Sequence, residues 1–179
     1  MIETKRTILK PIKQSDRDAV FAYRSDAETN QYQGWIPKTI DDVETFIAKC
    51  ADELDRPNTW FQFVIIEKDS KTIIGDLGVH FIGSENRQCE LGCTLSRARH
   101  GKGFASEVMT AIISYLFSKL DKHRIIGSID PHNTSSINLV ERLGFRKEAH
   151  FKQNYFANNQ WHDELVYAIL KHEWIKYKR

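Results

Sequence analysis

The chain has 179 residues, of which 41% are hydrophobic and 28% charged, and its formal net charge is +2. These values are typical of one folded domain with a full hydrophobic core, so we expect a single domain over residues 1–179. The balanced charge does not favour nucleic-acid binding, which requires a basic patch or stripe. No apolar run reaches the roughly 20 residues of a membrane-spanning helix, and no membrane association is expected.

The cysteines and histidines indicate neither a metal site nor a disulfide framework. The three cysteines, Cys50, Cys89 and Cys93, lack a second ligand pair, and the seven histidines show no metal-ligand spacing. The N-terminal segment lacks the hydrophobic region of a secretory signal peptide. Reduced cysteines in a cytoplasmic protein explain this pattern, so we expect no metal.

The first third of the chain predicts a strand followed by two short helices. Residues 4–10 alternate weakly between apolar and polar. Ser15 and Asp18 have the spacing of a capping box that would open a helix. Thr39 and Asp42 repeat that spacing before apolar residues that recur at helical intervals up to position 54.

The segment between these helices, residues 29–37, reads as a loop that carries two aromatic side chains, Tyr32 and Trp35. Two interpretations stay open. The aromatic residues form a wall of a binding site, or they cover the hydrophobic core as a lid.

The middle of the chain predicts three strands in hairpin succession, over residues 60–67, 72–82 and 89–96. The first is aromatic and β-branched, and a turn at 69–71 separates it from the second. In the third run, side chains alternate between the two faces of the sheet.

The last part predicts helices and strands in alternation. Apolar residues between 105 and 116 mark one helix face, and a buried strand is expected over 124–129. A second short helix should end at Gly144, and two more strands follow. The hairpins and the two β-α-β crossings together predict a mixed, mostly antiparallel α/β sheet of about seven strands with about four helices, including one parallel pair.

Residues 98–108, ARHGKGFASEV, predict an anion-binding loop. Gly101 and Gly103 allow a sharp turn and a close approach to a ligand. The first amides of the following helix have no helical acceptor, and the helix dipole favours an anion beside them. Arg99 and Lys102 add positive charge nearby.

Two nucleotide-binding loops fit this segment poorly. A Walker loop requires Ser or Thr directly after the lysine, where this chain has Gly103. A dinucleotide-binding loop requires a third glycine where Ser106 stands, and it should follow the first strand of a parallel sheet instead of three hairpin strands.

Residues 100–105 resemble the acyl-CoA pyrophosphate loop of the GNAT N-acetyltransferase superfamily, with the pattern Q/R-x-x-G-x-G/A, except that His100 replaces Gln or Arg. Other segments resemble the RimJ/RimL-like branch, the ribosomal-protein N-terminal acetyltransferases and their relatives, in matching order. Cys93 replaces a Tyr in one of them. The segments are YQGWIP at 32–37, ELGC at 90–93, NTSS at 133–136, LGF at 143–145 and WHD at 161–163.

This resemblance implies a single-domain GNAT fold with splayed central strands. It also implies direct transfer of an acetyl group from acetyl-CoA to an amine, with no metal and no covalent enzyme intermediate. The residues implied to contact the cofactor are Leu91, Cys93, Thr94, Leu95, Arg99, His100, Gly101, Lys102, Gly103, Phe104, Ala105, Ser106 and Asn133.

Two residues are candidates for the proton transfers. Glu90 is the candidate base, and the alternative is a strand glutamate paired with Arg or Lys. A free α-amine has a pKa of about 8 and a lysine amine about 10.4, so one carboxylate acting through a water suffices for an N-terminal acceptor. Ser136 stands where the branch has a proposed serine acid, and the alternative is a serine that satisfies helix amides.

On the acceptor side we expect Tyr32, Trp35, His80 and Trp161. His80 is also a second candidate base, and the alternative is a structural strand histidine. Trp161 and Asp163 are either substrate-side residues or residues that close the sheet. The expected activity is acetyl transfer to a primary amine, which is a protein N-terminus or a small molecule such as a polyamine or an aminoglycoside. A non-catalytic acyl-CoA-binding module is the alternative from another class, motivated by the substitutions at His100 and Cys93. Monomer and homodimer both stay open.

Overall fold

One sheet of eight strands, in the order β1-β2-β3-β4-β5-β6-β8-β7, runs through the protein. The computed structural model describes residues 1–157 and 159–177. The strands are β1 (Ile2–Glu3), β2 (Thr7–Pro11), β3 (Thr59–Glu67), β4 (Ile73–Ile82), β5 (Gln88–Leu95), β6 (Arg124–Ile129), β7 (Arg146–Ala157) and β8 (Gln160–Leu170).

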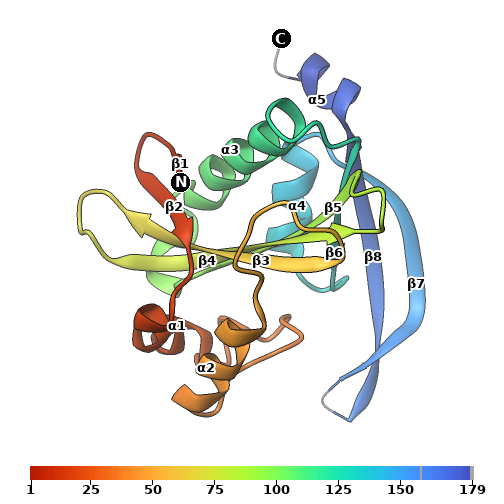
Figure 1. The fold of residues 1–179 in the computed structure, drawn as a ribbon. Coiled ribbons are helices and arrows are strands. Elements are labelled where there is room, and N and C mark those ends of the chain that lie inside the picture. Colours follow the sequence, from red (N-terminus) through yellow and green to blue (C-terminus); the bar gives the residue numbers. More distant parts are fainter. Residues whose placement is uncertain (158, 178–179) are drawn as a thin grey trace.

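The helices lie on both faces of this sheet (Figure 1). Helices α3 and α4 pack on one face over the larger hydrophobic core, and α1 and α2 pack on the other over a smaller cluster. We call these the α3 face and the α1 face. The helices are α1 (Arg17–Arg24), α2 (Ile40–Lys49), α3 (Phe104–Ser118), α4 (Thr134–Arg142) and α5 (Lys171–Tyr177), with 3-10 turns at Gln14–Asp16 and Arg97–Arg99.

The predicted mixed α/β sheet is confirmed, with two additions. The sheet has eight strands instead of about seven, because Ile2 and Glu3 of β1 pair with Leu9 and Ile8 of β2. A two-residue strand is too short to show a periodic pattern. Helix α5 follows β8 directly and was not predicted.

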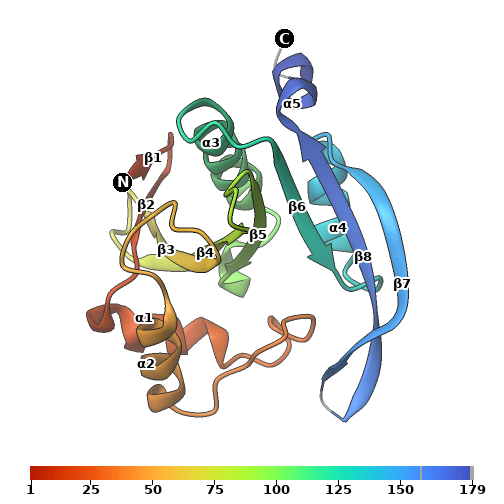
Figure 2. The same ribbon diagram turned by 45° about the vertical axis from the view of Figure 1, so that its right-hand side comes forward.

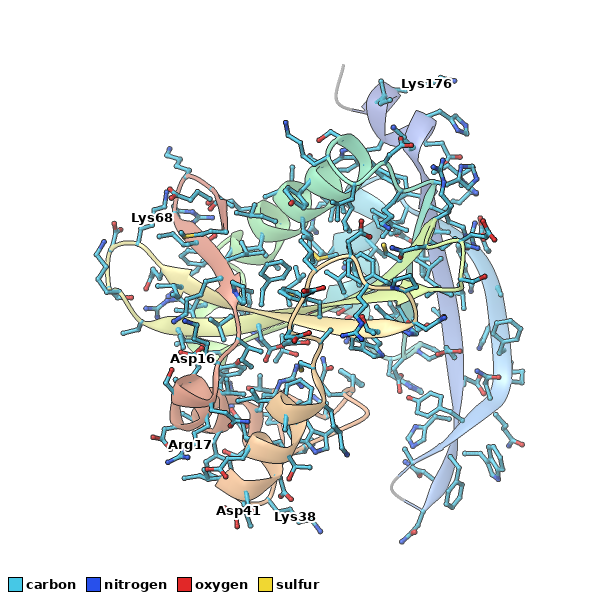
Figure 3. All side chains as sticks on the ribbon, in the orientation of Figure 1. Asp16, Arg17, Lys38, Asp41, Lys68 and Lys176 are labelled. Carbon is cyan, nitrogen blue, oxygen red and sulfur yellow. The ribbon has the colours of Figure 1, made fainter. Side chains whose placement is uncertain are left out.

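The two predicted capping boxes have different outcomes. The one that opens α2 is confirmed, since the Thr39 hydroxyl accepts the Asp42 amide at 3.2 Å and the Asp42 carboxylate accepts the Thr39 amide at 2.9 Å. The box on Ser15 and Asp18 is wrong. Asp16 instead accepts the Lys13 amide at 2.9 Å, so the chain turns two residues earlier, directly after β2 (Figure 3).

A buried ion pair fixes α1 to the sheet. The Arg24 guanidinium donates to both oxygens of Asp76 on β4, at 2.5 and 2.6 Å, and the carboxylate is fully buried. Tyr23 and Gln62 donate to the same carboxylate at 2.6 and 2.7 Å. Burial, and then the Asp76 charge, raises the pKa of Tyr23, so its phenol keeps the proton that it donates. These contacts hold α1 against β4.

The sheet opens between β5 and β6, its one parallel pair. Pairing joins residues 88–90 of β5 to residues 124–126 of β6 and ends at Glu90. Beyond that point β5 continues along β4 to Leu95, while β6 continues along β8 to Ile129. The two strands therefore diverge, as expected from the resemblance, and Figure 2 shows β6 turning away from β5. We call this opening the splay.

Candidate active site

A cavity of about 840 Å³ lies beside the end of β5. Its walls come from the loop after β5, the start of α3, helix α4 and the loop between α1 and α2. A smaller cavity of about 110 Å³ lies in the splay, lined by β5, β6 and α4. The two cavities share Tyr32, Gln33, Cys93, Asn133, Ser136 and Leu139. We call residues 96–103, between β5 and α3, the α3 loop. A long ligand can thus extend from the α3 loop into the sheet.

The loop before α3 presents free backbone donors to the large cavity. Gly101 and Gly103 adopt φ of 71° and 79°, the left-handed region that favours glycine. In the described part of the chain, the amides of residues 101–106 donate to no acceptor, and the first helical bond at this end runs from Glu107 to the Gly103 carbonyl. Several unpaired amides at a helix N-terminus form an anion site.

His100 holds this loop against the end of β5. Its Nε2 lies 2.9 Å from the Leu95 carbonyl oxygen, and because a carbonyl only accepts, Nε2 carries the proton. The backbone amide of His100 donates to Arg97 at 3.1 Å. The departure from the family pattern at this position therefore has a structural role in the protein: the imidazole fixes where the loop leaves the strand.

The two basic side chains of the loop, Arg99 and Lys102, differ in their position relative to the large cavity. Arg99 lines the large cavity, but its guanidinium donates to Glu67 at 2.6 Å. Hydrogen bonds from Arg99 and then Ser70 lower the pKa of Glu67, so the pair is ionised at neutral pH. Lys102 lines neither cavity, and its carbonyl accepts from Arg6 at 2.9 Å. The amides, more than these cations, face the cavity.

Arg6, in the turn between β1 and β2, anchors the loop from the outside. Its Nε donates to Glu107 in the first turn of α3 at 2.6 Å, and its guanidinium lies 4.1 Å from the centre of the Phe104 ring. The Glu107 carboxylate also accepts the Arg6 amide at 2.7 Å and the Thr4 hydroxyl at 2.5 Å. Burial opposes ionisation of Glu107, but these hydrogen bonds outweigh it and lower its pKa. We call these contacts of Arg6 with Glu107 the clamp, and no local sequence pattern predicts it.

Asn133 and Ser136 lie where the two cavities meet. Asn133 caps α4, because its side-chain oxygen accepts the Ser136 amide at 3.1 Å. The Ser136 hydroxyl has no hydrogen-bond partner in the described residues. It is therefore free to donate to a ligand atom at the splay.

Glu90 and His80 form a cross-strand pair on the α1 face. Glu90 is paired with His80 in the register of β4 and β5, with 3.7 Å between its carboxylate and Nδ1 of His80. The imidazole stacks on Trp60 with ring centres 4.7 Å apart and planes at 7°. Glu90 is 24% exposed and lines neither cavity, although it is the residue at which the splay begins. A water can reach it, as the base hypothesis requires.

The predicted aromatic contacts divide into three groups by position. Tyr32 is 36% exposed and lines both cavities. Trp35 stacks on Phe46 of α2 at 4.8 Å within the cluster of the α1 face and lines neither cavity. Trp161 is 59% exposed near the tip of the β7–β8 hairpin, in edge-to-face contact with Phe156 at 5.5 Å.

Of the remaining predicted cofactor contacts, all face one cavity or the other. Leu91 lines the cavity in the splay, and Cys93 lines both. The others line the large cavity and are Thr94, Leu95, Phe104, Ala105 and Ser106. One carboxylate that the sequence analysis missed, Asp130, also lines the cavity in the splay.

Within residues 1–157 and 159–177, no group of three or more His, Cys, Asp or Glu side chains is placed to hold a metal ion. Burial raises the pKa of the Cys93 thiol to about 12, so it is protonated and a poor nucleophile at neutral pH. Among the helices of the described part of the chain, none has the length and apolar content that crossing a membrane requires.

The chain is similar to known acetyltransferases over most of its length. The family described as acetyltransferase (GNAT) domain matches residues 6–146. The uncharacterized N-acetyltransferase p20 of Bacillus licheniformis is 32% identical over 171 residues, covering 96% of each chain. The crystal structure of a GNAT-family acetyltransferase from Bacillus anthracis shares 30% identity with a TM-score of 0.86, covering 96% of this chain and 99% of that one.

Two further relatives have named acceptors. The [ribosomal protein uS5]-alanine N-acetyltransferase of Escherichia coli is 32% identical over 124 residues, which are 69% of this chain and 64% of that protein. The spermidine N(1)-acetyltransferase of Vibrio cholerae is 26% identical over 111 residues, 62% of this chain and 64% of that protein.

Proposed function

The chain belongs to the GNAT acetyltransferase family and is an N-acetyltransferase, and from that premise we propose that it transfers an acetyl group from acetyl-CoA to the α-amine of a protein N-terminus. The observation that carries the proposal is the continuity of the two cavities. Free amides lie at one end, and the splay and a free serine hydroxyl lie at the other.

The α3 loop is proposed to bind the pyrophosphate of acetyl-CoA. The unpaired amides of residues 101–106 supply donors, and the dipole of α3 favours negative charge at its N-terminus. His100 and the Arg6–Glu107 clamp hold these amides in place before the ligand arrives. The site therefore needs little reordering on binding, which lowers the entropic cost of binding.

The splay is proposed to receive the pantetheine arm and the thioester. Beyond Glu90, β5 no longer pairs with β6, so its β6-facing backbone groups from Leu91 onward are available to the arm. An amide directed at the thioester oxygen would stabilise the negative charge that develops on it during transfer. Leu91 and Cys93 line this part of the cavity.

The chain's residues would then move two protons. The acceptor enters as an ammonium, and Glu90 removes one proton through a water to expose the nitrogen lone pair. The nitrogen–carbon bond forms, the carbon–sulfur bond breaks, and the second proton of the nitrogen passes to the departing thiolate. Ser136 donates a hydrogen bond to the departing thiolate, whose conjugate acid has a pKa of about 8.5 and already leaves readily. The products are an N-acetyl amide, free thiol and one proton.

Within the family we place the protein with the RimJ/RimL-like branch. The ordered segments at 32–37, 90–93, 133–136, 143–145 and 161–163 support this placement. The uS5-alanine relative supports an N-terminal acceptor. The spermidine relative supports the second candidate, a polyamine.

Calorimetry and an acceptor panel test the proposal. Acetyl-CoA should bind with micromolar affinity, and absence of binding at high micromolar ligand would refute the assignment of the cavity. Release of free thiol should then be measured with a peptide bearing an N-terminal alanine, with spermidine and with an aminoglycoside. Preference for the peptide is expected. Tight binding of acetyl-CoA without transfer to any amine would favour the non-catalytic module.

A further inference from the structure

The splay is flanked by two carboxylates that differ from the other ion-paired carboxylates of the protein. Glu90 lies where β5 leaves β6, and Asp130 directly follows β6. In the described part of the chain, their ion-pair partners are histidines alone: His80 for Glu90, and His132 and His162 for Asp130. The other ion-paired carboxylates contact at least one Arg or Lys.

Asp130 is the one of these two carboxylates that lines the cavity in the splay. Its side chain is only 10% exposed. One oxygen, Oδ1, accepts the amide and Nδ1 of His132 at 2.8 and 2.9 Å. The other, Oδ2, has no hydrogen bond within the described residues, and Nδ1 of His162 lies 4.0 Å from it. A carboxylate oxygen in such a place needs a donor, which a ligand can supply.

The surroundings of Asp130 suit a cation on the α1 face. The register aligns Glu90 with Ile126 and Ile126 with Ala168, so even-numbered residues of β8 share the face of Glu90. His162 belongs to this set and stacks on Tyr155 at 5.1 Å with planes at 15°. Glu164 belongs to it as well and accepts the Asn154 amide at 2.6 Å. Burial, and then the nearby carboxylates of Asp130 and Glu164, raise the pKa of Tyr155.

We propose that Asp130 binds the ammonium group of the acceptor, with His162 and Tyr155 as the wall behind it. This role rests on the proposed N-acetyltransferase function. In this proposal the two carboxylates have different roles. Asp130 lies at the cavity and holds the charged amine through a charge-assisted hydrogen bond, whereas Glu90 lies outside the cavity and takes the proton through a water. The acceptor is therefore recognised as a cation before it reacts.

Steady-state kinetics of Asp130→Asn test this role, with Asp163→Asn as the matched control. Asp163 lies on the β7–β8 hairpin that carries His162 and Tyr155 but on its opposite face, held by Lys152 and His150. Asp130→Asn should raise the acceptor KM by roughly 10- to 100-fold, the effect of losing a charged hydrogen-bond partner. It should lower kcat less and leave acetyl-CoA affinity by calorimetry unchanged. Asp163→Asn should leave the acceptor KM within about twofold of the wild-type value.

The outcomes separate this role from the proposed function. Asp130→Glu, which keeps the charge, should recover part of the acceptor affinity, and it also serves if the Asn variant does not fold. Transfer by the wild-type protein with an unchanged acceptor KM in Asp130→Asn would overturn the role of Asp130 and leave the function standing. An equal rise in KM in Asp163→Asn would show a structural effect and overturn it too. Absence of transfer by the wild-type protein to every amine tested would overturn the function and the role together.

Discussion

The two ends of the site are built on different principles. At the α3 loop the ligand would meet the backbone at Gly101 and at residues 103–106, which the glycines and the helix start arrange locally. At the splay it would meet side chains from β5, β6, the turn after β6 and α4, with the proposed wall on the β7–β8 hairpin. A site made of backbone groups is determined by one short segment of the sequence, whereas a site made of side chains depends on how distant segments pack. The contrast suggests why the donor is easier to infer than the acceptor.

The largest expected effect is a loss of stability on breaking the buried ion pair between Arg24 and Asp76. Asp76→Asn leaves the buried Arg24 guanidinium without its counter-charge, which should lower the free energy of unfolding by about 3–5 kcal/mol. Chemical denaturation measures it, and Asp69→Asn in the exposed β3–β4 turn is the control, expected to change stability by less than about 0.5 kcal/mol. Equal stability of the two variants would mean that the Arg24 pair does not hold the sheet.

A charge in the α3 loop should disable the donor end alone. Gly103→Asp should weaken acetyl-CoA binding by at least about 100-fold, roughly 2.7 kcal/mol, because it sets a negative charge beside the proposed phosphate and strains a φ of 79°. Gly103→Asn is the matched control, of equal size and tolerant of this backbone conformation but uncharged. Its loss should be about tenfold. Similar calorimetric affinities for the two variants would assign the effect to strain instead of charge.

Removing the proposed base should disable the acceptor end alone. Glu90→Gln should lower kcat by roughly 100-fold, the usual contribution of a general base, while acetyl-CoA affinity stays at the wild-type value. Glu85→Gln, on the exposed β4–β5 turn, should leave kcat unchanged. Wild-type turnover in Glu90→Gln would assign Glu90 to the strand-glutamate alternative, held only by its contact with His80.

The smallest effect should come from loosening the clamp on the α3 loop. Glu107→Gln should weaken acetyl-CoA binding by about three- to tenfold, since the amides remain but are less firmly held. A double-mutant cycle with Arg6→Met isolates the pair, and additive losses would mean that the two residues act separately.

The contribution of the Arg6–Glu107 contact to stability should depend on pH. The pKa of Glu107 is lower in the folded protein than in the unfolded chain, so its contribution to stability is complete above the unfolded value of about 4.3. That contribution should disappear as the pH falls through the folded pKa. Glu107→Gln should therefore reduce the loss of stability between pH 5 and pH 3, as thermal unfolding would show.

Features with a local sequence pattern could be predicted, whereas features that depend on distant contacts could not. The strand and helix order, the Thr39 cap and the glycine loop follow from local patterns, and the structure has them. Asp130 and the clamp of Arg6 on Glu107 carry no local pattern, because their significance comes from cross-sheet register and from contacts about a hundred residues apart. Trp35 illustrates the reverse case: the aromatic loop suggested a binding wall or a lid, and the ring packs on α2 beside the smaller core.

The clamp also bears on the order in which the protein assembles during synthesis. Arg6 leaves the ribosome early, but its partner Glu107 follows 101 residues later. The loop that is proposed to hold the pyrophosphate can be fixed only after β5 and the start of α3 have been synthesised. The turn between β1 and β2 can then pack against the start of α3. A truncation of residues 1–6 would remove Ile2, which packs against the larger core, and would also leave this loop without its Arg6 and Thr4 contacts.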